Sequence, residues 1–136
     1  MVATLIIPAL IVGAVASVME LAFVHSDEGV GAHWLTHGLH AVPTCMVGAV
    51  ISMNASWALS FLPKSISSIA WLTYALPVLV GLIIAFKVKA AAAIIHGHGN
   101  VGEKLPHALA VGAVIAVAPF IWPFIAPAVP AFLKKF

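Results

Sequence analysis

The sequence predicts an all-α fold, an integral-membrane antiparallel bundle of four transmembrane helices, and two observations lead to it. Of the 136 residues, 63% are hydrophobic and only 7% are charged, whereas a water-facing surface needs about 25–35% charged residues. The chain also contains four long apolar runs, and about 20 apolar residues are enough to cross a bilayer once. We therefore expect one transmembrane domain, residues 1–136, surrounded by the lipid bilayer, with the cell membrane as its location.

The first two predicted spans are separated by a polar connection. Residues 5–24 form the first apolar run, which ends where three ionisable residues and a glycine fall within residues 25–29. Residues 39–62 form the second run, which ends before Pro63 because proline does not continue a helix easily. Each run is long enough for one crossing.

The third and fourth predicted spans are residues 66–90 and 106–133. A glycine-rich and histidine-rich segment, residues 96–100, separates them. Pro106 suits the first turn of a helix, whereas the later prolines remove backbone donors inside the span, so we expect a kink near Pro119.

The helix count decides where the histidines lie. Four crossings place both chain ends and the turn at Pro63 on one side of the membrane, and we expect this side to be the inner one. The two remaining loops then share the other side. All seven histidines fall in or beside these two loops: His25, His33, His37, His40, His96, His98 and His107.

Three of these histidines form a candidate metal site. If the segment that contains them is helical, His33, His37 and His40 share one stripe at i, i+4 and i+7. Imidazole is a suitable ligand for Cu or Zn, and His25 is a further candidate ligand. The alternative is that these side chains cap helix ends and contact headgroups at the membrane surface.

Acidic and amide side chains near the loops add further candidates. Asp27 or Glu28 could complete a metal site or orient a histidine ring. Glu20 lies inside the first apolar run, where an acid suggests a proton relay or a ligand working with His25 or His107, or else a hydrogen-bonded structural acid.

Two residues of the second run have simpler interpretations. Asn54 can donate and accept hydrogen bonds across helices, which is most often a packing role in membranes. Cys45 is the single cysteine, so the chain forms no internal disulfide and no cysteine-only metal site.

Residues 20–29, 33–43 and 51–54 carry a family resemblance. Their sequences, ELAFVHSDEG, HWLTHGLHAVP and ISMN, resemble small archaeal multi-span membrane proteins of the kind that accompany archaeal ammonia monooxygenase. That enzyme is a copper membrane monooxygenase whose large subunits carry the metal chemistry. The resemblance implies an accessory subunit that contacts larger partners, and it assigns no ligand residues.

The sequence therefore predicts an accessory subunit of a larger membrane oxidoreductase complex, with a structural or stabilising role. Its expected partners are larger membrane subunits or further copies of itself. The chain has no phosphate-binding glycine loop and no nucleophile motif, and its six lysines form no run that could follow a nucleic-acid backbone. The alternative is a membrane protein that binds a transition metal through histidine or transports metal ions or protons.

Overall fold

The computed structural model describes residues 4–28, 34–95 and 104–134, without the side chains of residues 28, 34–39 and 91–95. Every regular element in these ranges is a helix. The long helices are α1 (Ile6–Glu28), α2 (Trp34–Met53), α5 (Leu72–Ile95) and α6 (Leu105–Ile125). The short elements are α3 (Ala55–Leu59), α4 (Lys64–Ser67) and the 3-10 turns η1 (Ala126–Ala128) and η2 (Ala131–Leu133).

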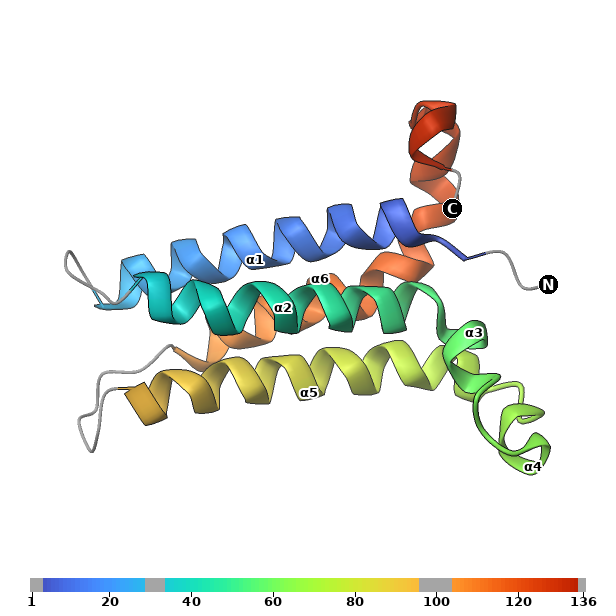
Figure 1. The fold of residues 1–136 in the computed structure, drawn as a ribbon, viewed down its shortest axis with the longest axis horizontal. Helices are drawn as coiled ribbons and strands as arrows, with labels where there is room; N and C mark the ends of the chain where they lie inside the picture. Colours follow the sequence, from blue (N-terminus) through green and yellow to red (C-terminus); the bar gives the residue numbers. More distant parts are fainter. Residues whose placement is uncertain (1–3, 29–33, 96–103, 135–136) are drawn as a thin grey trace.

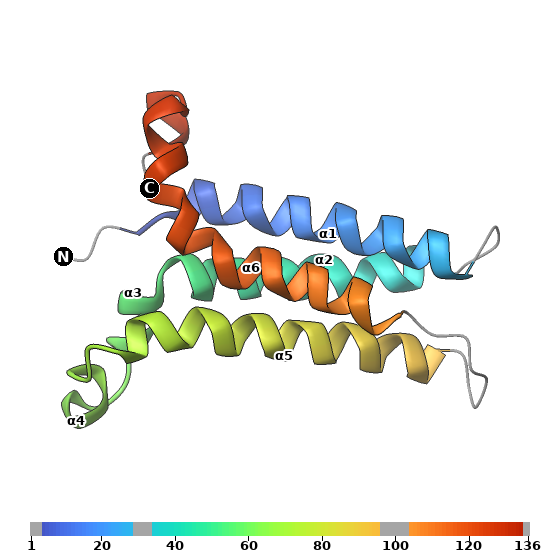
Figure 2. The ribbon, with the colours of Figure 1, turned by 180° about the vertical axis from the view of Figure 1, so that it is seen from behind.

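The four long helices lie side by side (Figures 1 and 2). Helix α1 packs mainly against α2, and α5 packs mainly against α6, while α2 contacts α5 and α1 contacts α6. We call the end where α1 ends and α2 and α6 begin the histidine end, and the opposite end, where α2 ends and α5 begins, the proline end.

The predicted all-helical class is confirmed for the described residues, and so is the presence of helices that can cross a membrane. Three stretches are long and apolar enough for a crossing: Ile6–Asp27, Leu72–Ala90 and Leu105–Ala128. In α2 the apolar stretch found is shorter, His40–Met53.

The second helix ends earlier than the sequence suggested. We expected it to continue to Leu62, but α2 ends at Met53 and Asn54 leaves the helical conformation, with φ −120° and ψ 41°. The Asn54 Nδ2 group donates to the Val50 carbonyl over 2.9 Å, so the side chain competes for the backbone groups that a continuing helix would use. Hydropathy does not register this competition.

The other expected boundaries shift for related reasons. The third long helix begins at Leu72 rather than residue 66, because residues 64–67 form the separate short helix α4. The fourth ends at Ile125 rather than residue 133, and two 3-10 turns follow it. Pro63 directly precedes α4, and Pro127 and Pro130 lie in the segment that follows α6, as expected for residues that lack a backbone N–H. No proline lies between α4 and α5.

Small residues let the helices approach closely. A Cβ atom built on Gly81 would lie 2.4 Å from the Gly112 carbonyl oxygen, and one built on Gly13 would lie 2.9 Å from the Met46 Cα atom. Neither distance is possible for a real side chain, so α5–α6 and α1–α2 packing requires glycine at these positions. Such contacts are typical of helix pairs in membranes, where apolar burial alone gives no preference.

Candidate functional site

Asp27 is the centre of a polar cluster at the histidine end. Its Oδ2 atom accepts a hydrogen bond from the Lys104 backbone N–H over 3.0 Å and lies 2.8 Å from His107 Nδ1. The Lys104 Nζ atom lies 3.0 Å from Asp27 Oδ1. The Asp27 side chain is only 2% exposed, so a carboxylate from α1 is buried against the first turn of α6.

This arrangement satisfies the start of α6. The first N–H groups of a helix have no partner within the helix, and a negative charge near them is favoured by the helix dipole. Lys104 is the N-cap residue of α6, and no side chain of the adjacent sequence caps the helix. Asp27, from another helix and 77 positions away in sequence, instead accepts from the N–H of the N-cap residue itself.

The same contact orients His107. The Phe23 ring stacks on its imidazole with the ring centres 4.3 Å apart and an angle of 10° between the planes. The Asp27 carboxylate is hydrogen-bonded to Nδ1 of His107. The Nε2 atom of the same ring makes no hydrogen bond with the described part of the chain. A carboxylate that fixes one ring nitrogen while the other stays available is the usual outer partner of a metal-ligating histidine.

The remaining candidate ligands lie at this end where the structure describes them. His25 is in the last turn of α1 and His40 is near the start of α2, and both are exposed. His33 and the side chains of His37 and Glu28 lie outside the described residues. Among the side chains that are described, no three His, Cys, Asp or Glu groups gather to hold a metal ion. The predicted stripe of three histidines remains a prediction.

Glu20 is buried on the inner face of α1, as expected of an acid inside an apolar run. One turn earlier, Ser17 is also buried, and its hydroxyl donates to the Gly13 carbonyl over 2.7 Å. The inner face of α1 thus carries several polar groups toward the histidine end.

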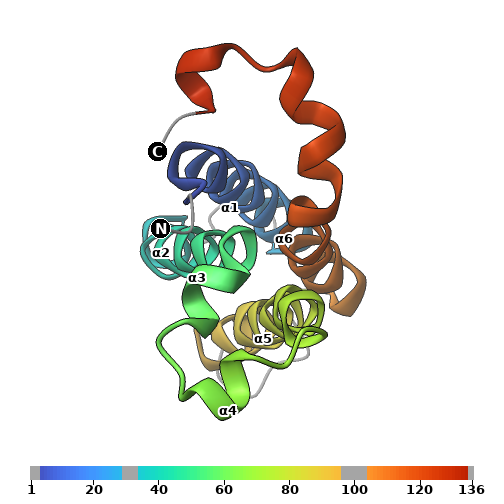
Figure 3. The same ribbon diagram turned by 90° about the vertical axis from the view of Figure 1, so that its right-hand side faces the viewer.

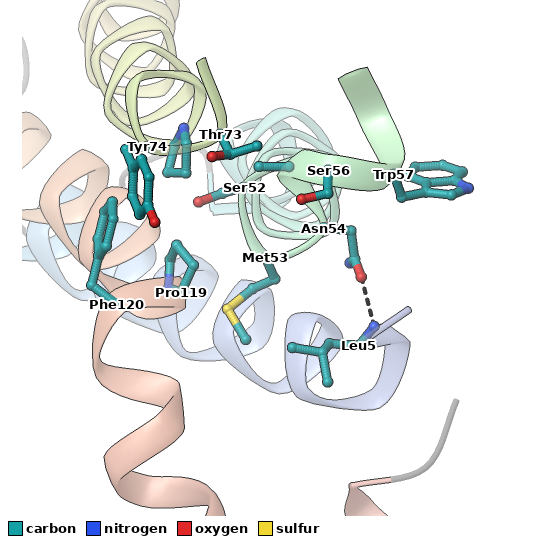
Figure 4. A pocket seen from close by; sticks show the side chains of 12 residues that line it. Leu5, Ser52, Met53, Asn54, Ser56, Trp57, Thr73, Tyr74, Pro119 and Phe120 are labelled. Atoms are coloured by element: carbon teal, nitrogen blue, oxygen red, sulfur yellow. Dashed lines mark hydrogen bonds between the residues drawn. The ribbon is translucent and has the colours of Figure 1, made fainter. Parts of the chain in front are cut away.

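Asn54 makes two hydrogen bonds at the proline end, one of them between helices. Its Oδ1 atom accepts from the Leu5 backbone N–H over 2.6 Å (Figure 4), and its Nδ2 group donates to the Val50 carbonyl. Leu5 directly precedes α1. The Asn54 side chain therefore bonds both to the backbone N–H just before α1 and to a carbonyl in the last turn of α2.

Ser52 is a polar contact that the sequence analysis missed. Its hydroxyl is buried and donates to the Ile115 carbonyl over 2.7 Å. In a regular helix that carbonyl would accept from the residue four positions later, but this residue is Pro119, which has no N–H. The interior proline was the signal that could have revealed the need for an outside donor.

A cavity of about 310 Å³ opens beside these two residues (Figure 4). No charged side chain lines it, and the polar side chains of its lining residues carry hydroxyl groups, one amide and one indole N–H. Because Asn54 and Ser52 already hydrogen-bond to the backbone, the cavity suits a neutral molecule at most. Its lining residues are Leu5, Ser52, Met53, Asn54, Ala55, Ser56, Trp57, Thr73, Tyr74, Pro77, Pro119 and Phe120.

Comparison with protein-family models, with curated proteins and with solved structures gave no match. Function must therefore be inferred from the residues and contacts of the chain itself.

Proposed function

We propose that the protein is a small accessory subunit of a larger membrane oxidoreductase complex, crossing the bilayer four times and stabilising its partners through helix contacts. The resemblance of residues 20–29, 33–43 and 51–54 to accessory subunits of archaeal ammonia monooxygenase suggests the copper membrane monooxygenases as the class of host enzyme. The observation that carries the proposal is a groove of about 250 Å³ on the outer surface between α5 and α6.

The α5–α6 groove has a floor of small residues. Gly81 and Ala85 of α5 and Gly112 and Ala116 of α6 form the floor, each pair four positions apart. Larger or exposed residues stand along its two sides: Val78, Leu82, Leu109 and Ala113.

Such a groove fits a transmembrane helix of another subunit. Small residues allow a neighbouring backbone to come close, and dispersion contacts and interhelical hydrogen bonds then favour association within lipid. The partner we propose is an apolar helix of a larger subunit, which the groove would receive along its length.

Substitution of Ala113 by phenylalanine tests the groove. Ala113 is exposed on α6 and lines the groove, so Ala113→Phe blocks the groove without entering the α5–α6 contact. Ala14→Phe is the matched control, because Ala14 is an exposed alanine on α1. Native mass spectrometry after mild-detergent extraction from native membranes is expected to show a foreign subunit with the wild type and with Ala14→Phe, but not with Ala113→Phe.

Two results contradict the proposal. A wild-type protein found only as a monomer or a closed homo-oligomer would remove the accessory role. If Ala113→Phe retains as much partner as Ala14→Phe, the partner does not use the α5–α6 groove.

We infer a second candidate function, transition-metal binding at the histidine end, from the contact between Asp27 and His107. This contact leaves Nε2 of a positioned ring available, at the end where His25 and His40 also lie. Elemental analysis of untagged protein is expected to find one Cu or Zn per chain, with less in His40→Ala. A content far below one metal ion per chain contradicts it.

A further inference from the structure

We propose that two segments at the proline end lie flat in the lipid interface and fix the depth of the bundle in the membrane. The first, which we call the α4 arm, is residues 60–71. The second, the C-terminal arm, is residues 119–134. The inference concerns how the chain meets lipid and is independent of the proposed partner subunits.

Both arms leave the packed bundle. No residue of either range is buried. The last buried residue before the α4 arm is Leu59, and the last before the C-terminal arm is Ala118. Neither arm therefore contributes a fully buried side chain to the core, and only the partly buried Trp122, near the start of the C-terminal arm, is found packed against it.

The arms extend sideways at one level. Figures 1 and 3 show the α4 arm and the C-terminal arm leaving the same end of the bundle on opposite sides, across the direction of the long helices. The rings of Tyr74 and Phe120 stack with their centres 6.4 Å apart, so the C-terminal arm begins level with the first turn of α5. If the long helices cross the bilayer, segments that run across them lie parallel to its surface. The crossing part of α6 is then residues 105–118, and the rest of the apolar stretch Leu105–Ala128 lies in the interface.

The exposed side chains identify lipid as the occupant of this surface. In the α4 arm, Phe61 is 71% and Trp71 63% exposed, and in the C-terminal arm, Phe124 is 84% and Phe132 71% exposed. Water is a poor solvent for such residues, whereas segments that lie in the interface turn Trp, Phe and Leu side chains toward the acyl chains.

The charges of the arms agree with this placement. Lys64 is the only charged residue of the α4 arm and Lys134 the only one of the C-terminal arm, and neither arm contains an acid. A segment in the interface buries its apolar side chains to a depth of about 5–10 Å, and lysine can reach the headgroups from there with its flexible stem. A helix in the middle of the bilayer would instead need a donor for every backbone carbonyl, and Pro123 and Pro127 each remove a backbone donor from this segment.

Spin-label accessibility in vesicles tests the depth of each arm. Cys45 is replaced by alanine, and single cysteines are introduced in the full chain as Ile66→Cys, Phe124→Cys or Phe132→Cys. Val18→Cys reports the exposed middle of α1, and His25→Cys reports the histidine end. Collision rates with oxygen, which concentrates in lipid, and with a water-soluble nickel complex are compared in vesicles of phosphatidylcholine and phosphatidylglycerol.

We expect the oxygen-to-nickel ratio at all three arm positions to lie between the high ratio at Val18 and the low ratio at His25. A ratio at the arms equal to that at His25 would place them in water and overturn the proposal. Protection from both reagents would show that protein covers the arms and would overturn it equally. Each arm is labelled in its own variant. If the variant of one arm does not fold, the ratio measured in the other arm still tests the proposal.

Discussion

The histidine end and the proline end both supply partners for backbone groups that lack one within their own helix, but with different side chains. At the histidine end, the carboxylate of Asp27 accepts from the backbone N–H of the N-cap residue of α6 and also contacts the side chains of Lys104 and His107. At the proline end, the backbone groups left open around α1 and α6 are satisfied by neutral side chains, Asn54 and Ser52. The charged contact includes the exposed side chain of Lys104, which water can solvate. The neutral contacts are made by the buried side chains of Ser52 and Asn54.

The difference in side chains also gives the two ends different binding properties. The histidine end carries the ionisable groups that could bind a metal or a proton. The proline end carries aromatic and aliphatic surface and a cavity without charge. The two ends of the protein therefore differ in the kind of side chain that they carry, and the following substitutions test this difference.

The largest effect is expected at Asp27. Asp27→Ala removes the acceptor of the Lys104 N–H and the partner of His107 at a site that is almost fully buried, which lowers the free energy of unfolding by about 2–3 kcal/mol. Asp27→Asn keeps an oxygen acceptor and is expected to lose less. Unfolding by SDS titration in mixed micelles measures both. Equal stability of the wild type and Asp27→Ala would show that the buried carboxylate does not stabilise the histidine end.

Asn54 is the corresponding position at the proline end. Asn54→Ala removes two hydrogen bonds, to Leu5 N–H and from Nδ2 to Val50, and should lower the free energy of unfolding by about 1–2 kcal/mol. The same SDS titration measures it. Hydrogen exchange at the Leu5 amide should accelerate, whereas amides near His107 should not change. A uniform acceleration at both ends would contradict the idea that the two ends are fixed separately.

Ser52 and Pro119 allow a sharper test of the neutral contacts. Ser52→Ala leaves the Ile115 carbonyl without a donor and is expected to cost about 1 kcal/mol. Pro119→Ala restores an N–H at the position that would donate to this carbonyl, so Ser52→Ala should cost much less in the Pro119→Ala background. A double-mutant cycle on unfolding free energies measures this coupling. Additive effects would mean that Ser52 does not replace the missing donor.

The smallest effect is expected at Lys104. Its side chain is 66% exposed, and exposed ion pairs contribute at most about 0.5–1 kcal/mol. Lys104→Gln keeps the backbone N–H that Asp27 accepts, so its loss of stability should be well below that of Asp27→Ala. Adding salt should weaken the wild type only slightly. If Lys104→Gln matched Asp27→Ala, the ion pair rather than the helix-capping contact would hold the histidine end together.

The sequence predicted the helices better than the contacts between them. Apolar runs are read directly from hydropathy, so the long helices followed, and three stretches within the described residues are long and apolar enough to cross a membrane. The placement of Asp27 and His107 at one end followed from counting helices, but their contact did not, because 80 positions separate them and only packing decides which loop residues meet. The break at Asn54 was missed because a single amide barely changes the mean hydropathy of a run.

The Ser52 contact was missed for a different reason. Ser52 stands in a stripe of small residues with Gly48 and Ser56, which is typical of helix packing, and Ser52 itself contacts α6. Its hydroxyl acquires a specific partner only because Pro119 lies on another helix at the same height. Such a pairing requires the relative register of α2 and α6, which a single sequence does not encode in any local pattern.

The contact of Asp27 with the start of α6 also has a consequence for biosynthesis. Its two partners, Lys104 and His107, are translated about 80 residues after it. While the ribosome is still producing the middle of the chain, this carboxylate lacks both of these partners, so its charge needs water at the membrane surface in their place. The contact between α1 and the start of α6 can form only after α6 has been synthesised. The pair α1 and α2 is therefore made before the contact that joins α1 to α6.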